Sequence, residues 1–114
     1  KKIFAYIGDF LSERLAFIHI NDEEHGPFKM GTRGTPQGAV LSPLLFNIAM
    51  MKLPQALAVV VGICHAIYAD DITVWTNRDS LGEIKDRLQQ AASIVEDYVA
   101  QCGLQCAPTK SEFL

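Results

Sequence analysis

Residues 80–102 carry the pattern that most restricts how this chain can fold, because apolar side chains recur there every three or four residues. This spacing places them on one face of an α-helix of about six turns. Ser80 and Glu83 have the spacing of a capping box, and Gly103 lies where a C-terminal cap belongs. A helix with one apolar face must pack that face against another layer. The predicted face consists of Leu81, Ile84, Leu88, Ala91, Val95, Val99 and Cys102.

The first third of the chain predicts a helix followed by a hairpin. Apolar residues fall at helical spacing over residues 2–12, and residues 14–20 alternate and are rich in β-formers. The polar residues 21–27 are typical of a loop. We therefore expect residues 28–32 to return as the second strand of the hairpin.

A second helix is predicted after a glycine-rich loop. Ser42 suits the N-cap and Pro43 suits the first helical turn. Residues 44–52 are apolar nearly all round, so this helix is expected to be buried. Pro54 should end or kink it, because proline lacks the backbone N–H that a helix interior needs.

Two β-prone runs, residues 65–69 and 72–75, flank the pair Asp70-Asp71. They predict a tight hairpin with both carboxylates at its tip. After the long helix, residues 104–114 are short and mixed, and we expect a strand with a turn at Pro108. The order of elements predicts an α+β fold, with helices on one face of an antiparallel sheet.

Composition narrows the classes of function. The chain has 114 residues, enough for one domain with one core, and its hydrophobic share of 49% and charged share of 20% are ordinary for a globular chain. No apolar run approaches the roughly 20 residues that span a bilayer, so no membrane partner is expected. The net charge of −3 argues against an autonomous nucleic-acid binder, which is usually basic.

The cysteines give no disulfide framework, because Cys64, Cys102 and Cys106 are odd in number and irregularly spaced. Cys102 and Cys106 could form a metal pair with His65 as a further ligand, but a zinc site needs a second pair that the sequence lacks. Reduced thiols in an intracellular protein are the better interpretation.

The segment Tyr68-Ala69-Asp70-Asp71 sets two adjacent carboxylates inside an apolar hairpin. Their mutual repulsion disfavours double ionisation unless a cation or solvent offsets it. Mg²⁺ takes carboxylate and phosphate oxygens, so the pair is a candidate metal site. Successive strand residues point to opposite faces, so the two side chains need not serve one ion equally. A polar hairpin tip exposed to water remains the alternative.

The glycine-rich loop is the second candidate site. Gly34 and Gly38 allow a backbone to approach a ligand closely, and Gln37 offers both donor and acceptor groups for a base or a backbone. An ordinary Gly/Pro loop before a helix remains the alternative interpretation.

Taken together, the two segments resemble the reverse transcriptase family over essentially the whole chain. Residues 34–47, which include Thr-Pro-Gln-Gly-x-x-Leu-Ser-Pro-x-Leu-Phe-Asn, are similar to its motif B, and residues 68–72 to its motif C. The spelling of motif B resembles the non-LTR retrotransposon branch. Residues 10–14 resemble the segment that precedes motif B there, and residues 103–104 with 110–112 resemble motif D. The resemblance implies an RNA-directed DNA polymerase with a partial palm and fingers fold.

The resemblance also implies roles for residues around the aspartate pair. Asp70 would bind the catalytic metals, and Asp71 would be the more peripheral partner at the primer terminus. Tyr68 and Ala69 would lie under that terminus. The implied cofactor is Mg²⁺, two ions in the complete enzyme with Mn²⁺ as an alternative. One ion would activate the primer 3′-hydroxyl and the other would steady the triphosphate.

Further roles follow for the substrate side. Gln37 and Gly38, with Pro36 beside them, would line the pocket for the incoming deoxynucleotide and the template. Lys110 would donate a proton to the pyrophosphate leaving group, although an exposed surface lysine weighs equally. Arg14 and Arg33 could contact phosphates, although a solvated arginine is the better interpretation of each. The implied partners are an RNA template, a DNA primer and deoxynucleotides.

We expect residues 1–114 to be one slice of a longer reading frame. The family's motif A carboxylate would lie upstream, and Asp9 does not replace it because it falls within a helical pattern. The rest of the fingers and the thumb would also lie outside this chain. We therefore expect the chain alone to be inactive. A non-catalytic remnant of a decayed retroelement, with weak RNA binding at most, is the competing interpretation. Synthesis primed on chromosomal DNA would imply nuclear entry, but the compartment is left open between nucleus and cytoplasm.

Overall fold

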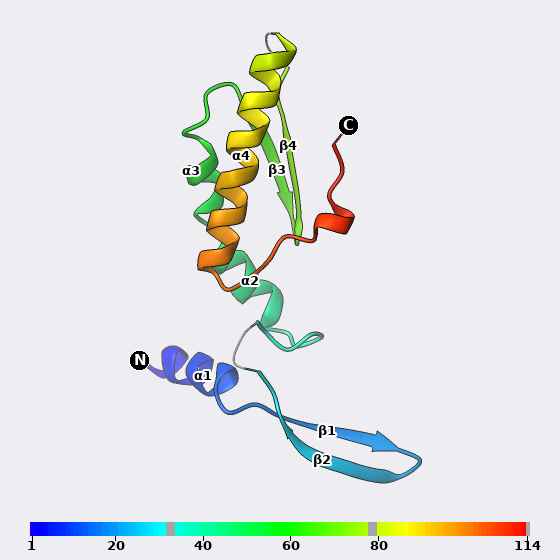
Figure 1. Ribbon diagram of the computed structural model, residues 1–114. Coiled ribbons are helices and arrows are strands. Elements are labelled where there is room, and N and C mark those ends of the chain that lie inside the picture. Colours follow the sequence, from blue (N-terminus) through cyan, green and yellow to red (C-terminus); the bar gives the residue numbers. More distant parts are fainter. Residues whose placement is uncertain (32–33, 78–79, 114) are drawn as a thin grey trace. The chain divides into compact units, whose positions relative to one another are not determined.

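The computed structural model describes residues 1–31, 34–77 and 80–113. The chain divides into two compact units, Lys1–Thr35 and Pro36–Leu114, whose elements are labelled in Figure 1. Each unit is described by itself below. The α+β class predicted from the sequence is confirmed, but the strands among these described residues form two separate two-stranded antiparallel sheets instead of one sheet.

The first unit contains helix α1 (Lys2–Leu11) and a hairpin of β1 (Leu15–Ile20) with β2 (Glu23–Lys29). The prediction of a loop over residues 21–27 is wrong, because Ile20 pairs directly with Glu23 across a two-residue turn. Both turn residues, Asn21 and Asp22, have positive φ, and Asn and Asp tolerate that region better than most residues.

Strand β2 was predicted with the wrong bounds because most of its residues are polar. Every residue of β2 is exposed, so neither of its faces carries the apolar alternation that marks a half-buried strand. The strand predicted at residues 28–32 therefore begins earlier and ends at Lys29, and residue 32 lies outside the described residues.

The second unit begins with helices α2 (Ser42–Met50) and α3 (Leu53–Leu57). The break between them agrees with the predicted effect of Pro54, which lies in the first turn of α3. Two expectations about α2 are wrong. Ser42 is the first helical residue, and Leu41 occupies the cap position. The helix is not buried all round, because Leu44 and Ile48 are 55% and 53% exposed.

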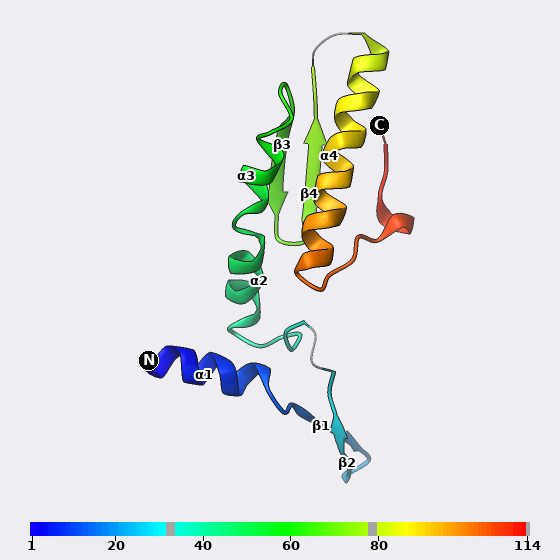
Figure 2. The same ribbon diagram turned by 60° about the vertical axis from the view of Figure 1, so that its left-hand side comes forward.

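The remaining elements of this unit are the hairpin of β3 (Cys64–Tyr68) with β4 (Asp71–Trp75) and the long helix α4 (Leu81–Gln101). Figure 2 shows α3 and α4 beside this hairpin. One face of the hairpin is half-buried against the core, and the other is exposed. The alternation that predicted the strands thus reflects a sheet with helices on one face only.

Side chains from α2, α3 and α4 meet in one core, and the partly buried hairpin residues Ile67, Ile72 and Val74 pack against it. The predicted apolar face of α4 is confirmed in its middle and wrong at its ends, since Leu81 is 86% exposed and Cys102 is exposed. No helix among the described residues has the length and apolar character to cross a membrane. The fully or nearly buried cluster is Met50, Leu53, Leu57, Ala91, Val95 and Val99.

Both predicted ends of α4 are confirmed. The backbone N–H of Ser80 donates to Glu83 Oε2 at 3.4 Å, which is one half of the capping box. At the other end Gly103 has φ +75°, and the N–H of Leu104 donates to the carbonyl of Val99 at 2.8 Å. This is a Schellman arrangement, and it satisfies carbonyls that the helix end leaves without partners.

The segment after α4 differs from its prediction. A short 3-10 helix, η1 (Pro108–Lys110), stands where we expected a strand with a turn at Pro108, and no strand occurs in the described residues 104–113. Proline at the start of a helical turn has a suitable φ and needs no N–H partner, which explains the difference.

Candidate active site

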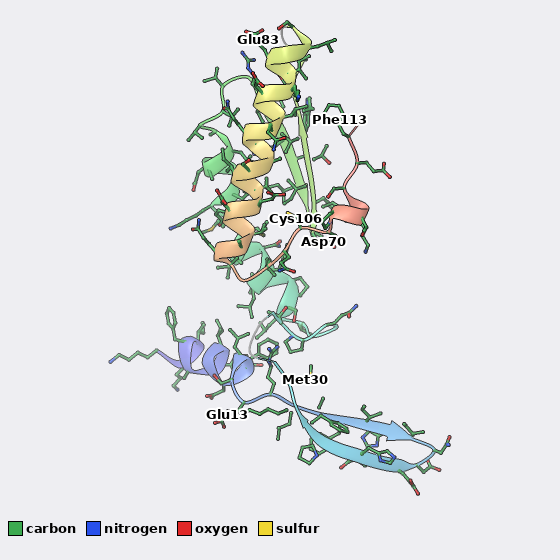
Figure 3. The ribbon with its side chains drawn as sticks, in the orientation of Figure 1. Glu13, Met30, Asp70, Glu83, Cys106 and Phe113 are labelled. Atoms are coloured by element: carbon green, nitrogen blue, oxygen red, sulfur yellow. The ribbon has the colours of Figure 1, made fainter. Side chains whose placement is uncertain are left out.

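The aspartate pair lies at the closed end of the β3–β4 hairpin. Tyr68 pairs with Asp71, so the turn consists of Ala69 and Asp70, and Asp71 is the first residue of β4. Figure 3 shows Asp70 at this end of the hairpin. The prediction of a tight hairpin is confirmed, with one correction: only one of the two carboxylates lies in the turn itself.

Ala69 holds the turn in an unusual backbone conformation, with φ +50°. A residue with a β-carbon in the left-handed region carries roughly 1–2 kcal/mol of steric cost. Such strained positions cluster at functional sites, where the surrounding structure enforces them. Here the flanking strand pairs Ile67–Ile72 and Tyr68–Asp71 enforce it.

The hairpin presents Tyr68 and Asp71 on the face that points away from the core. They are cross-strand partners, and such partners share one face of a sheet. Tyr68 is 82% exposed, whereas Ile67 and Ile72, one position along, pack against the core. The sequence alternation therefore explains why an aromatic ring and a carboxylate lie together in solvent at this end.

The two carboxylates have the chemistry that a hard cation requires, but two ligands are too few to complete its coordination. Asp70 and Asp71 are exposed, and within the described part of the chain neither forms a hydrogen bond or an ion pair. Their oxygens are the donors that Mg²⁺ prefers. No cluster of three or more His, Cys, Asp or Glu side chains exists among the described residues. The hairpin thus offers two carboxylates to a cation, and the described residues bring no third ligand of these types beside them.

The cysteines show no metal centre. Cys64, Cys102 and Cys106 are free thiols and are exposed. No ligand cluster in residues 1–31, 34–77 and 80–113 includes Cys102, Cys106 or His65. The described structure offers no support for the zinc alternative.

The loop that carries Gln37 is a tight turn. The N–H of Ala39 donates to the carbonyl of Pro36 at 3.3 Å, and Gly38 has φ +82° at the third position. This is the signature of a type II turn, in which glycine is favoured at that position. Gln37 and Gly38 are exposed, and no atom lies within 4 Å of the place a β-carbon on Gly38 would occupy. The turn leaves both residues accessible to a ligand.

The basic candidates have different surroundings. Arg14 is not a solvated arginine: its guanidinium donates to the carbonyl of Gly34 at 3.1 Å and to the carbonyl of Gly31. These bonds connect the end of the β1–β2 hairpin to the glycine-rich loop that follows it. No sequence pattern predicted this contact. Arg33 lies outside the described residues. Lys110 is an exposed residue in the last turn of η1, and it forms no ion pair with Asp70 or Asp71 in the described residues.

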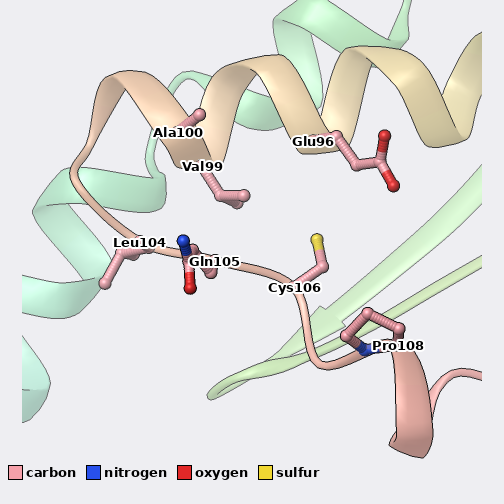
Figure 4. Close-up of a pocket in the computed structure, with 7 residues that line it drawn as sticks. All are labelled: Glu96, Val99, Ala100, Leu104, Gln105, Cys106 and Pro108. Carbon is pink, nitrogen blue, oxygen red and sulfur yellow. The ribbon is translucent and has the colours of Figure 1, made fainter.

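A shallow groove follows the C-terminal half of α4 and contains none of the predicted site residues (Figure 4). Its walls are mainly apolar, with the side chains of Glu96 and Cys106 facing each other across it (Figure 4). The lining residues are Glu96, Val99, Ala100, Leu104, Gln105, Cys106 and Pro108. The groove is separate from the hairpin tip in sequence, and it adds no ligand to the carboxylate pair.

Comparison with known proteins shows which proteins this chain resembles. The chain is 34% identical over 73 residues to an RNA-directed DNA polymerase from the mobile element jockey of Drosophila funebris, covering 60% of this chain and 8% of that protein. It is 34% identical over 89 residues to a retrovirus-related Pol polyprotein from the type-1 retrotransposable element R2 of Nasonia vitripennis, covering 72% of this chain and 8% of that protein.

A third relative is a putative 115 kDa protein in the type-1 retrotransposable element R1DM of Drosophila melanogaster, 34% identical over 73 residues, covering 63% of this chain and 7% of that protein. The chain thus spans less than a tenth of the length of these curated relatives. No solved structure gives a significant match. The family model described as reverse transcriptase (RNA-dependent DNA polymerase) matches residues 1–114. The resemblance noted in motifs B, C and D is therefore confirmed at the level of the family, and this chain belongs to the reverse transcriptases, with non-LTR retrotransposon proteins among its relatives.

Proposed function

We propose that the chain is the part of an RNA-directed DNA polymerase that supplies two of the metal-binding carboxylates of the polymerase site. The complete protein would extend a DNA primer on an RNA template during retrotransposition. Membership of the reverse transcriptase family, and the RNA-directed DNA polymerase of the mobile element jockey among the relatives, support the reaction class. The observation that carries the proposal is the exposed pair Asp70 and Asp71, without ionic partners in the described residues, at the end of a hairpin.

In this proposal Asp70 and Asp71 hold Mg²⁺, or Mn²⁺ in its place. The chemistry that the bound ions supply is neutralisation of charge on the attacking and leaving oxygens of a phosphoryl transfer. The exposed ring of Tyr68, on the same face as Asp71, offers an apolar surface beneath the primer terminus. Ala69 leaves room there because its side chain is a single methyl group. Most of the work of such a site is positioning and charge stabilisation.

The turn at residues 36–39 would meet the incoming nucleotide and the template. The amide of Gln37 can donate and accept, and the open backbone at Gly38 allows a close approach. Lys110 would protonate the departing pyrophosphate. It is exposed, so the proposal needs it to meet the substrate in the complete enzyme.

We further propose that the chain alone does not polymerise. A third carboxylate, from a motif A strand of the complete protein, would complete the metal site. The purified chain should then show no Mg²⁺-dependent extension of a DNA primer on an RNA template. Extension by the purified chain would show that two carboxylates suffice, and this part of the proposal would be wrong.

The decisive experiment uses the complete parent protein. Asp70→Asn and Asp71→Asn keep the size of each side chain while removing its charge, and each should reduce primer extension, Asp70→Asn to below detection. Asp86→Asn makes the same change at an exposed position on α4 and should leave extension unchanged. A parent protein that shows no extension before any substitution would favour the remnant interpretation. Wild-type extension in both hairpin variants would show that the metal ligands are misassigned.

A further inference from the structure

The hydroxyl of Ser42 forms a different hydrogen bond from the one that its position in the sequence predicts. Ser42 is the first residue of α2, and its Oγ donates to the carbonyl of Pro36 at 2.5 Å. A serine at a helix start usually accepts from the N–H groups of the first turn. Here the hydroxyl donates backwards along the chain instead, and it closes a loop over residues 36–42.

Backbone hydrogen bonds within the loop involve the same residues, Pro36 and Ser42, together with Ala39. The carbonyl of Pro36 also accepts the N–H of Ala39 at 3.3 Å, and the N–H of Ser42 donates to the carbonyl of Ala39 at 3.1 Å. Two consecutive turns thus share Ala39, and the Pro36 carbonyl receives one backbone and one side-chain donor. Because the side-chain bond spans both turns, it fixes the first turn relative to the helix that follows.

The part of the loop that this bond holds is the part that faces solvent. Pro36, Ala39 and Ser42 are half-buried, whereas Gln37 and Gly38 are exposed between them. Exposed turns with few packed neighbours open at low free energy unless hydrogen bonds restrain them. A restrained backbone fixes the position from which the Gln37 side chain extends, which lowers the entropic cost of binding a ligand there.

We propose that Ser42 is a positioning residue for the nucleotide and template contact made by Gln37 and Gly38. This inference rests on the proposed function. Ser42 acts through the Pro36 carbonyl and touches no substrate itself. Its loss should weaken binding at the turn while leaving the carboxylate pair at Asp70 and Asp71 unaltered.

The test compares three variants of the complete parent protein. Ser42→Ala removes the hydroxyl, Ser42→Thr retains it, and Ser93→Ala removes an exposed hydroxyl on α4 as the matched control. The first readout is the KM for deoxynucleotide at a fixed primer and template. An unfolded fraction lowers the apparent kcat but leaves KM unchanged, so KM separates positioning from a purely structural role.

Ser42→Ala should raise KM about three- to tenfold, the loss expected for one neutral hydrogen bond. Ser42→Thr should restore KM, and Ser93→Ala should match the wild type. An unchanged KM in Ser42→Ala, or a fall in kcat that only follows the unfolded fraction, would overturn the proposal. So would an equal rise in KM in Ser42→Ala and Ser93→Ala.

The second readout is hydrogen exchange, and it needs no activity. In Ser42→Ala the two hydrogen-bonded amides of the loop, those of Ala39 and of residue 42, should exchange faster, while those of α4 should keep the wild-type rate. Wild-type exchange at both loop amides would overturn the restraint even if KM rises. A parent protein that binds no nucleotide and extends no primer would defeat the proposed function instead, and exchange would still decide whether Ser42 holds the turn.

Discussion

The phenol of Tyr98 donates a hydrogen bond to the carbonyl of Ala49 at 2.7 Å, and this bond joins α4 to α2 through residues that lie 49 positions apart in the chain. Ala49 belongs to the last turn of α2, whose carbonyls have no partner within their own helix. The bond therefore satisfies a helix end and fixes the α2 terminus against α4. Since α2 follows the turn that carries Gln37, this contact connects the loop region to the core of the second unit.

We predict that Tyr98→Phe lowers the free energy of unfolding by about 1 kcal/mol, because the half-buried carbonyl of Ala49 loses its shorter hydrogen bond and keeps only the weak thiol donor of Cys102, at 3.8 Å, while the ring remains. Urea denaturation of the 114-residue chain measures the change. Tyr6→Phe is the matched control, since Tyr6 is 62% exposed on α1 and its hydroxyl forms no bond in the described residues. Equal effects of the two changes would show that the Tyr98 bond adds no stability.

The core makes a stronger prediction at Leu53, which is 0% exposed among side chains of α3 and α4. Leu53→Ala should destabilise the chain by about 2–5 kcal/mol, because it removes buried methyl groups and leaves a cavity. Leu81→Ala changes a leucine that is 86% exposed and should shift stability by less than about 0.5 kcal/mol. A small effect at Leu53 would mean that the observed packing is not the packing in solution.

The turn of the β3–β4 hairpin gives a prediction with opposite signs at two alanines. Ala69→Gly should stabilise the chain by about 0.5 kcal/mol, because the relief of a left-handed β-carbon exceeds the added entropy of the unfolded state. Ala66→Gly, inside strand β3 where φ is not positive, should destabilise it by about 0.5–1 kcal/mol. Thermal or urea unfolding of both variants checks the signs. Destabilisation by both would show that Ala69 is not strained in solution.

Much of the fold could be predicted from the sequence wherever a pattern reports burial. The capping box at Ser80, the cap at Gly103 and the strand alternation beside Asp70 are local signals, and the structure has all three. The errors come where tertiary context decides. Strand β2 has no buried face, so its sequence shows no alternation of apolar and polar residues. Leu44 is apolar but exposed, because only one side of α2 packs against the core of the described second unit.

The candidate site divides in the same way. The turn chemistry of Gly38 and the carboxylates of the hairpin are visible in the sequence because each depends on residues close together in the chain. Two side-chain hydrogen bonds are not visible in the sequence. Arg14 bonds to Gly34, 20 residues away, and Tyr98 bonds to Ala49, 49 residues away, and no periodic pattern links either pair. Side-chain partners at such separations follow from the packing of whole elements.

Lys110 provides the last prediction, which separates proton transfer from metal binding. In the complete parent, Asp70→Ala should abolish primer extension, because the cations lose a ligand. Lys110→Ala should only slow it, by about a hundredfold in kcat if the lysine is the general acid. Lys85 is also an exposed lysine but lies on α4, and Lys85→Ala should leave the rate of primer extension unchanged. Because Lys110 is itself exposed, its removal should leave the folded structure intact, and a loss of rate would then report on chemistry. Equal and mild losses in Asp70→Ala and Lys110→Ala would show that neither residue has the role proposed for it.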